Sequence, residues 1–519
     1  MILVIFIGLT AVSTLVVMSF TAPGPVLPTD LSEVWRTLTI PVELVPASVD
    51  SVRTNDYDAL REVLEMNEKF RGSLPTSFKA GQVERGPLLN RIIEKEDGYR
   101  ITTEQRSMMA TPSISGNRLF VPGGFGSKVY YAFDLETHKP LWTANLDDDG
   151  PSPAACTDSL IVFNTESCTM FVLDQLTGKM LWSRWLGDPL MSTPMVAQGR
   201  VFTSYPKGIQ SHDNGPSVPN TMAPSHPFVC FDLRQGTILW QVWLDGDVLS
   251  TAVADEGSIY LTTFPGTLYK LDQQTGTIQA AMGMRATSVP AIMGEEIFVT
   301  KRADKDSTVM ESIAVLDRST LGFLREFRAR KAVYLDHRVQ SKSRYKSSAL
   351  AYDAGNGFAD GAPASSGAFQ AERNIGASNV SSLQAFMGST IIPFDGSLYT
   401  LMGDSLFCLE PALGDVRWSL KITADMHAEG GTAATAPIVC DAYVVTATIT
   451  GRVIVCDRRS GQVKLDLAAG GPVRYAPIMV KGKLYVPTTD GELVCLDTKD
   501  AALDGWPMLM RSADHFCAR

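Results

Sequence analysis

The 519-residue sequence has no excess of basic residues, since 46 Lys and Arg stand against 56 Asp and Glu, a formal net charge of −10. Nucleic-acid-binding proteins normally carry a basic footprint, so this balance argues against a nucleic-acid partner. Histidine is scarce, with six in the chain, and no two are spaced with a Cys or His as zinc ligands are. The sequence also has no Gly-rich phosphate loop and no nucleophile elbow. These absences leave no recognisable catalytic or metal-binding motif.

Charged side chains are absent from the start of the chain, where the first ionisable side chain is Asp30. The apolar residues 1–20 are long enough for a helix across a bilayer core roughly 30 Å thick. No Lys or Arg precedes this run, as a signal peptide normally requires, and Ala22 is the best cleavage position. The first Cys is Cys156, so the sequence excludes a lipid-anchored lipoprotein. We predict that residues 1–22 are a signal peptide or a membrane anchor, and that the protein is in the cell envelope, on the periplasmic or extracellular side, anchored or secreted.

A pattern of three residue types recurs eight times through the rest of the chain. An apolar run ends in an acid, a Gly follows four residues later, and Trp or another apolar residue follows eight residues later, as in FVLDQLTGKMLW (171–182). Two further apolar runs, separated by a polar turn, precede each copy. The minimum spacing is 40 residues, and the acids are Asp134, Asp174, Asp232, Asp272, Asp317, Glu410, Asp457 and Asp497. Four strand signals per unit, repeated eight times, predict an all-β fold: an eight-bladed β-propeller of four-stranded antiparallel blades.

The three repeated residue types have structural roles in this interpretation. The acid can accept hydrogen bonds from backbone N–H groups of the turn that follows it. Gly can adopt the positive φ that such a tight turn needs. Trp offers a large apolar face to the neighbouring blade and an indole N–H to a backbone carbonyl. We therefore expect these residues to build the scaffold rather than to bind a ligand.

The pattern A-x-D-x-x-T-G-x-x-x-W resembles the quinoprotein-type repeat over about residues 105–510. That repeat occurs in pyrroloquinoline-quinone (PQQ) alcohol dehydrogenases and in the propeller lipoprotein of the outer-membrane β-barrel assembly machine. The resemblance implies an eight-bladed propeller but little about function, because one fold hosts many activities. The dehydrogenases' adjacent cysteine pair and the C-x-x-C-H haem motif are missing, and their calcium ligands and catalytic Asp cannot be matched. We expect no cofactor, with PQQ and calcium as the alternative.

Six of the eight cysteines occupy recurrent strand positions: Cys156, Cys230, Cys408, Cys440, Cys456 and Cys495. At such positions Cys usually serves as a small buried hydrophobe, so we expect mostly free, buried thiols. Cys168 and Cys517 have no such position, and a disulfide bond that involves either residue stays open.

Three insertions exceed the basic repeat, at residues 205–227, about 326–380 and 422–437. The first lies between the second and third strands of its blade, and the other two lie between blades. In an up-and-down blade these connections emerge on the same face of the ring. Long loops on a rigid scaffold often carry function, so we expect this face to bind a partner.

Polar or aromatic residues in the links that lead to innermost strands are the candidates for this binding face: Asp147, Asp149, Asp188, Asp247, Arg285, Asp425, His427, Glu429, Arg474 and Tyr475. The stretch 147–150 faintly resembles a calcium loop but lacks the ligand spacing of an EF-hand, so we interpret it as a solvated link. No metal site is predicted.

The 326–380 insertion begins with a basic run, and its candidate residues are Arg328, Arg330, Lys331, Arg338, Lys342, Arg344 and Lys346. It then turns to small and polar residues. Three interpretations stay open: a solvated loop, an arm that binds an acidic partner, an anionic lipid or a polyanionic saccharide, and a lid over a substrate cleft.

Residues 23–104 form a predicted linker ahead of the 105–510 propeller, and residues 511–519 a tail. Tyr57, Leu60, Val63, Leu64 and Phe70 indicate a short amphipathic helix begun by Asn55 or Asp56. This helix would serve as a spacer from the membrane or pack on the propeller rim. Residues 86–104 are predicted to add an extra strand.

The sequence thus favours a membrane-tethered propeller that acts as a non-enzymatic protein-binding or assembly scaffold, with a protein or another envelope component as its partner. The alternative is an enzyme, either a PQQ-dependent dehydrogenase or a carbohydrate-active enzyme that uses the channel mouth.

Overall fold

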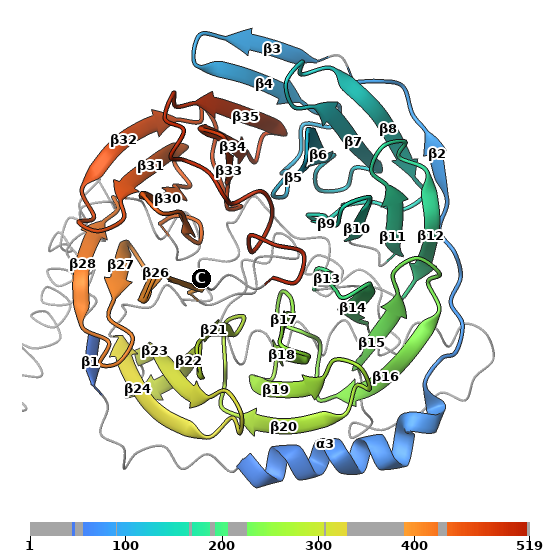
Figure 1. Cartoon of the computed structure of the whole chain (residues 1–519), viewed down its shortest axis with the longest axis vertical. Helices are drawn as coiled ribbons and strands as arrows, with labels where there is room; N and C mark the ends of the chain where they lie inside the picture. The colour runs from blue at the N-terminus through green and yellow to red at the C-terminus, as the bar shows by residue number, and fades with distance from the viewer. Residues whose placement is uncertain are drawn as a thin grey trace, which may run out of the picture. The chain divides into compact units, whose positions relative to one another are not determined.

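Eight antiparallel sheets surround a central axis in the computed structural model, and each sheet has one strand close to the middle of the ring (Figure 1). The structure describes residues 44–46, 56–89, 91–165, 169–186, 192–205, 226–305, 308–329, 389–423 and 433–515. Residues Pro41–Arg519 form one compact unit. The predicted eight-bladed propeller is confirmed. The predicted apolar helix at residues 1–22 lies outside the described residues.

The blades are numbered in chain order, and their strands are given from the innermost outward. Blade 1 has β5 (Ser113–Ser115), β6 (Arg118–Pro122), β7 (Val129–Asp134) and β8 (Pro140–Leu146). Blade 2 has β9 (Ala155–Cys156), β10 (Leu160–Asn164), β11 (Thr169–Asp174) and β12 (Met180–Trp185). Blade 3 has β13 (Met195–Ala197), β14 (Arg200–Ser204), β15 (His226–Asp232) and β16 (Ile238–Leu244), and blade 4 has β17 (Val253–Asp255), β18 (Ser258–Thr262), β19 (Thr267–Asp272) and β20 (Ile278–Gly283). Blade 5 has β21 (Ala291–Met293), β22 (Glu296–Lys305), β23 (Thr308–Asp317) and β24 (Phe323–Ala329). Blade 6 has β25 (Ile391–Phe394), β26 (Ser397–Met402), β27 (Ser405–Leu409) and β28 (Val416–Lys421). Blade 7 has β29 (Ile438–Val439), β30 (Tyr443–Ala447), β31 (Arg452–Asp457) and β32 (Val463–Ala468), and blade 8 has β33 (Ile478–Val480), β34 (Lys483–Pro487), β35 (Glu492–Asp497) and β4 (Gly98–Thr102).

The acid of each repeat organises the turn between the third and fourth strands, as predicted. In blade 5 the Asp317 carboxylate accepts hydrogen bonds from the Thr320 backbone N–H at 2.8 Å and from the Ser319 and Thr320 hydroxyls at 2.6 and 2.7 Å. These bonds favour the charged carboxylate, and with the Ser319 hydroxyl as the largest contributor they lower the pKa of Asp317 to about 2. The acid therefore belongs to the scaffold.

Trp and Gly meet where one blade packs on the next. Trp240 of blade 3 donates its indole N–H to the Gln273 carbonyl of blade 4 at 3.2 Å. A Cβ atom added to Gly276 would lie 2.4 Å from the Trp240 ring, and Gly276 also has a φ of +70°. Gly is therefore required both for the turn and for the close approach of the ring. The same contact joins Trp142 to Gly178, Trp182 to Gly236 and Trp418 to Gly461.

The junctions that lack this pair fill the same space with other side chains. Ala280 stands where blade 4 would carry its Trp, and the Gly position of blade 5 is Leu321, which is buried with a φ of +58°. The Tyr260 hydroxyl replaces the indole N–H and donates to the Arg318 carbonyl at 3.4 Å. A small residue on one blade is thus matched by a large one on the next.

Between blades 5 and 6 two residues divide the role of the Trp. The Phe327 ring takes the position against Gly414, where an added Cβ would lie 2.5 Å from the ring. Arg325 donates to the Pro411 carbonyl at 2.8 Å, the hydrogen bond that an indole makes elsewhere. Apolar contact and hydrogen bond are therefore both retained without a Trp.

The ring closes between blades 8 and 1 through residues that precede the repeats. β4 pairs with β35 and is the fourth strand of blade 8. Its Tyr99 ring lies 3.8 Å, centroid to centroid, from the His138 ring, which occupies the Gly position of blade 1 with a φ of +57°. The predicted extra strand within 86–104 is confirmed, and it completes the propeller from before the predicted boundary at residue 105.

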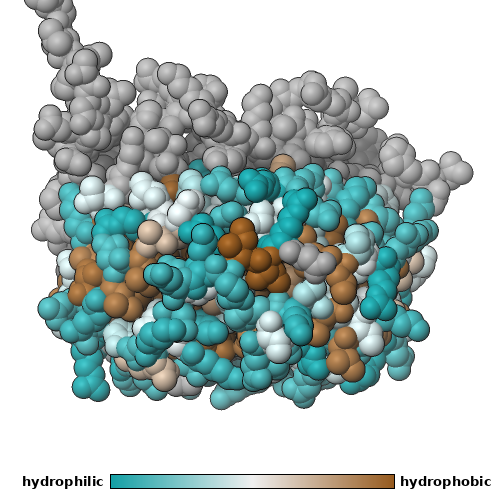
Figure 2. Space-filling view, turned by 90° about the horizontal axis from the view of Figure 1, so that it is seen from above, coloured by the Kyte–Doolittle hydropathy of each residue, from teal (hydrophilic) through white to brown (hydrophobic). Residues whose placement is uncertain are grey.

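The described residues before β4 (44–46, 56–89 and 91–97), which we call the belt, follow the outer rim (Figure 1). Along the belt β1 (Leu44–Pro46) pairs with β24, α3 (Asp56–Phe70) and the 3-10 turn η2 (Arg71–Ser73) contact β16, β2 (Val83–Arg85) pairs with β8, and β3 (Ile92–Lys95) pairs with β4. In edge-on view, the visible side of the rim is mostly hydrophilic with separate hydrophobic patches (Figure 2). The belt thus adds a fifth strand to blades 1, 5 and 8.

The predicted amphipathic helix is α3, and it packs on the rim. Val63 is buried, and the Asn67 side-chain amide pairs with both backbone groups of Trp243, accepting from its N–H at 2.8 Å and donating to its carbonyl at 3.0 Å. Leu64, which the sequence assigned to the apolar face, is 47% exposed. The prediction that included Leu64 in that face was wrong, because the buried side is set by contacts with β16 and β20.

Candidate binding face

Hydrogen bonds show which connections share a face of the ring. The link after blade 1 holds the loop between the second and third strands of blade 2, since the Asp148 carboxylate accepts from the Thr165 and Thr169 hydroxyls at 2.7 and 2.6 Å. We call this face, which carries the second-to-third-strand loops and the links between blades, the loop-rich face. On the opposite face the first-to-second and third-to-fourth turns meet, as where the Gln175 N–H donates to the Ser159 carbonyl at 2.9 Å. This opposite face is called the tight-turn face.

All three insertions connect elements on the loop-rich face, as predicted. Residues 206–225 join β14 to β15, residues 330–388 join β24 to β25, and residues 424–432 join β28 to β29. β24 continues to Ala329, so the second insertion follows that residue rather than beginning at 326. The candidate Arg328 is therefore a strand residue that pairs with Val45 of β1.

The inner end of the loop-rich face carries a ring of buried hydroxyl residues, which we call the hydroxyl ring: Thr111, Ser152, Ser192, Ser250, Thr287, Ser389 and Thr435. Polar groups here join neighbouring blades. The Asn164 amide donates to the Ser192 carbonyl at 2.6 Å, and the Thr262 hydroxyl donates to the Ser288 carbonyl at 2.7 Å. Satisfied in this way, the polar groups stabilise the inner strands. The hydroxyl ring was missed in the sequence, although four of its members stand one or two residues before a Pro: Thr111, Ser152, Ser192 and Thr435.

Asp247 is the candidate that the structure buries most completely. Its side chain is 1% exposed, and its carboxylate accepts from the Ser204 hydroxyl and from the Val248 N–H. The Ser204 oxygen lies 3.0 Å from the Ser192 oxygen, so Asp247 belongs to the polar network around the hydroxyl ring. Nearby Asp245, which the sequence did not single out, accepts from the Thr267 hydroxyl, and burial raises the pKa of its carboxyl. Both carboxylates therefore hold links in place.

The other described candidates are distributed around the ring rather than gathered. Asp147 is exposed and accepts from the Lys128 ammonium through its carbonyl at 3.1 Å. Arg285 is half-buried with a φ of +57°, and its Cα packs against Gly266. Asp149 and Arg474 are half-buried, and Tyr475 is buried. These five residues come from three links, those after blades 1, 4 and 7, so they are spread around the ring rather than gathered in one link.

The remaining candidates lie outside the described residues, and their predicted role in binding stays a prediction: Asp188, Asp425, His427, Glu429, Arg330, Lys331, Arg338, Lys342, Arg344 and Lys346. Cys168 and Cys517 also lie outside them. The other six cysteines are free and buried, as predicted.

The described residues do not fit PQQ, the cofactor of the dehydrogenases that share the repeat. The free cysteines belong to separate strands or turns, and burial raises the pKa of several, including Cys456 to about 12. The blade tryptophans lie on outer strands, and Trp506 lies at the tight-turn face. In the described ranges no group of three His, Cys, Asp or Glu side chains is placed to hold a metal ion. We therefore assign no step of chemistry to this group.

Fold and repeat together define a PQQ-like repeat propeller. The family model described as outer membrane protein assembly factor BamB matches residues 99–213, 227–392 and 403–509, so the chain belongs to this family.

Two curated relatives and one solved structure illustrate the likeness. The chain is 26% identical over 194 residues, 32% of its length, to the quinoprotein alcohol dehydrogenase PedH of Pseudomonas putida. It is 20% identical over 250 residues, 46% of its length, to the outer membrane protein assembly factor BamB of Yersinia pestis. These matches span 29% and 60% of the two relatives. The computationally designed Ika8 protein aligns with a TM-score of 0.50 at 14% identity, over 76% of this chain and 98% of its own, which is a likeness of fold alone.

Among the described residues, no helix is both long enough and apolar enough to cross a membrane.

Proposed function

We propose that this propeller is a non-enzymatic scaffold of the cell envelope that binds a protein partner through its loop-rich face. The observation that carries the proposal is that the two faces of the ring differ in the length of their connections. The family model that matches the chain is described as an outer membrane protein assembly factor, which supports a scaffold role. Every insertion point opens on the loop-rich face, whereas the opposite face carries the tight turns and the first part of the C-terminal segment, where the Gly482 N–H donates to the Leu503 carbonyl at 2.8 Å. An exported location, with residues 1–22 as signal or anchor, is part of the proposal.

Site-specific photo-crosslinking tests which face contacts the partner. A photoreactive residue would replace exposed Asp147 or Asp490 on the loop-rich face, and in matched controls exposed Glu136 or Arg459 on the tight-turn face. In the host's envelope we expect a crosslinked protein from the first pair only. Crosslinks from the second pair only, or equally from both, would refute binding through the loop-rich face.

The second candidate is a quinone-dependent dehydrogenase, which the 194-residue match to PedH favours. Purified protein would be incubated with PQQ and calcium and assayed for dye-linked oxidation of alcohols and sugars. Activity that depends on both additions would overturn the scaffold proposal. Its absence, together with loop-rich-face crosslinks, supports the scaffold.

A further inference from the structure

Residues 498–515, which we call the strap, run from β35 across the tight-turn face into the middle of the ring (Figure 1). The Tyr443 hydroxyl of blade 7 donates to the Asp500 carboxylate at 2.6 Å. Farther along, the Ile114 N–H of blade 1 donates to the Pro507 carbonyl at 2.7 Å. The Val196 N–H of blade 3 and the Ala254 N–H of blade 4 donate to the carbonyls of residues 513 and 514 at 2.7 and 3.0 Å. One short segment thus bonds to blades on all sides of the channel.

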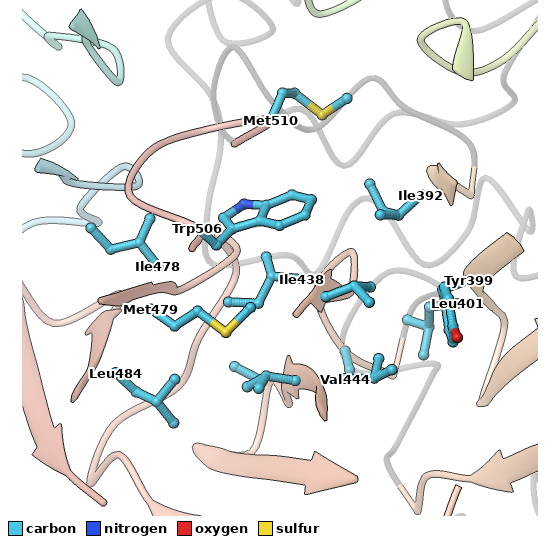
Figure 3. Packing of buried hydrophobic residues seen from close by; sticks show 14 of the residues in the cluster. Ile392, Tyr399, Leu401, Ile438, Val444, Ile478, Met479, Leu484, Trp506 and Met510 are labelled. Atoms are coloured by element: carbon cyan, nitrogen blue, oxygen red, sulfur yellow. The ribbon is translucent and has the colours of Figure 1, made fainter. Parts of the chain in front are cut away.

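Apolar side chains seat the strap over the inner strands. Trp506 is 2% exposed and exchanges two backbone hydrogen bonds with Met479 of β33, at 2.9 and 3.0 Å. Its indole lies in a cluster that includes Ile438 of blade 7 and Ile392 of blade 6 (Figure 3). Met510 of the strap belongs to the same cluster, so the strap closes the channel at this face with apolar contacts.

The strap backbone is unusually strained for its length. Lys499, Met510, Arg511 and His515 have φ values of +60°, +51°, +73° and +59°. Left-handed backbone is energetically costly for residues other than glycine and persists only where surrounding contacts impose it. The strap is attached by single or paired hydrogen bonds to separate blades, whereas each blade is held by continuous ladders. The strap is therefore held by separate attachments rather than by a ladder, and its backbone is costlier than that of the sheets beneath it.

We propose that the strap opens as a unit while the eight blades stay folded, which alternately seals and unseals the channel at the tight-turn face. Elements with few cooperative contacts open at lower free energy than the global structure. The ring has a separate closure on its outer side, where β4 pairs with β35, so strap release does not break the circle of blades.

Two cysteines of blade 7 report on this opening. The Cys440 thiol lies under the strap and donates to the Ala502 carbonyl at 3.3 Å. The Cys456 thiol, on β31 of the same blade, is 0% exposed and buried within the sheets. Strap opening exposes Cys440 but leaves Cys456 covered, so the second thiol is a matched internal control.

The test measures alkylation of each cysteine in the full-length chain by mass spectrometry, with rates normalised to those of the urea-unfolded chain. We expect Cys440 to react at least tenfold faster than Cys456 in water, with a weaker dependence on urea. Equal normalised rates, or the same urea dependence, would overturn the proposal without any variant.

Two variants separate strap opening from fraying of the nearby turn. Trp506→Ala removes the main apolar anchor and is expected to accelerate Cys440 labelling at least tenfold relative to Cys456. Trp418→Ala removes a blade tryptophan instead and should accelerate the two thiols by similar factors. If Trp506→Ala leaves the Cys440 to Cys456 ratio unchanged, the exposure comes from the turn and the proposal fails.

Discussion

The Trp–Gly contact between blades 3 and 4 allows a quantitative prediction. Trp240 is 7% exposed, and Trp240→Ala is expected to lower the free energy of unfolding by about 4 kcal/mol, as for other buried aromatic residues. Gly276→Leu places a Cβ 2.4 Å from the Trp240 ring in left-handed backbone. This clash and the strain together should cost roughly 3 kcal/mol or more.

The double variant is the informative one. With the indole removed, the introduced leucine side chain fills the vacated space, as Leu321 does beside Ala280 one junction later. Only the strain and the lost hydrogen bond to Gln273 should remain, so the double variant is expected to cost about 3 kcal/mol, against a sum of about 7 kcal/mol for the single variants. The expected coupling free energy is therefore about 4 kcal/mol.

Urea unfolding followed by circular dichroism measures this coupling, because the signal does not depend on the tryptophan removed. Gly276→Leu combined with Trp418→Ala, in distant blade 6, is the control, and its costs should add within about 0.5 kcal/mol. Additive costs for Trp240→Ala with Gly276→Leu would show that the two positions do not share one packing space, and the reasoning would be refuted.

Three further predictions concern single positions. His515 lies beside Thr251, the Ala252 carbonyl and Asp514, and burial lowers its pKa from 6.5 to about 4. The unfolded chain therefore takes up a proton at this residue before the folded chain does, so the free energy of unfolding is highest above pH 6.5 and declines as the pH falls toward 4. Between pH 7 and pH 5 the His515→Asn variant should lose about 2 kcal/mol less of its free energy of unfolding than the unchanged protein does. An unchanged pH profile of unfolding would contradict this. Leu321→Gly restores the repeat's glycine yet should lower stability by roughly 2 kcal/mol, because it empties a buried position, and a raised melting temperature would contradict this. Asn67→Ala leaves the Trp243 backbone groups without their side-chain partner and should cost about 2 kcal/mol and expose the belt to protease; unchanged cleavage would count against the docking of α3.

The candidate face was predictable only in outline. Insert lengths indicated which face carries the long connections, because strand connectivity alone decides that. The charged candidates were chosen one link at a time, and the structure disperses the described ones around the ring. The hydroxyl ring was overlooked because single Ser and Thr residues in separate links show no pattern until the fold buries them together at the start of the innermost strands.

What the sequence determined by itself is the repeat and therefore the ring. Acid, Gly and Trp recur at fixed offsets because each acts within one turn or one junction, and such local roles leave a period in the chain. The tertiary structure alone decided how the ring is closed and covered. The pairing of β4 with β35 and the contacts of the strap join residues hundreds of positions apart. The Tyr99–His138 stack joins residues closer in the sequence, but it too is made once in the ring. Contacts made once have no period, so only the folded chain shows them.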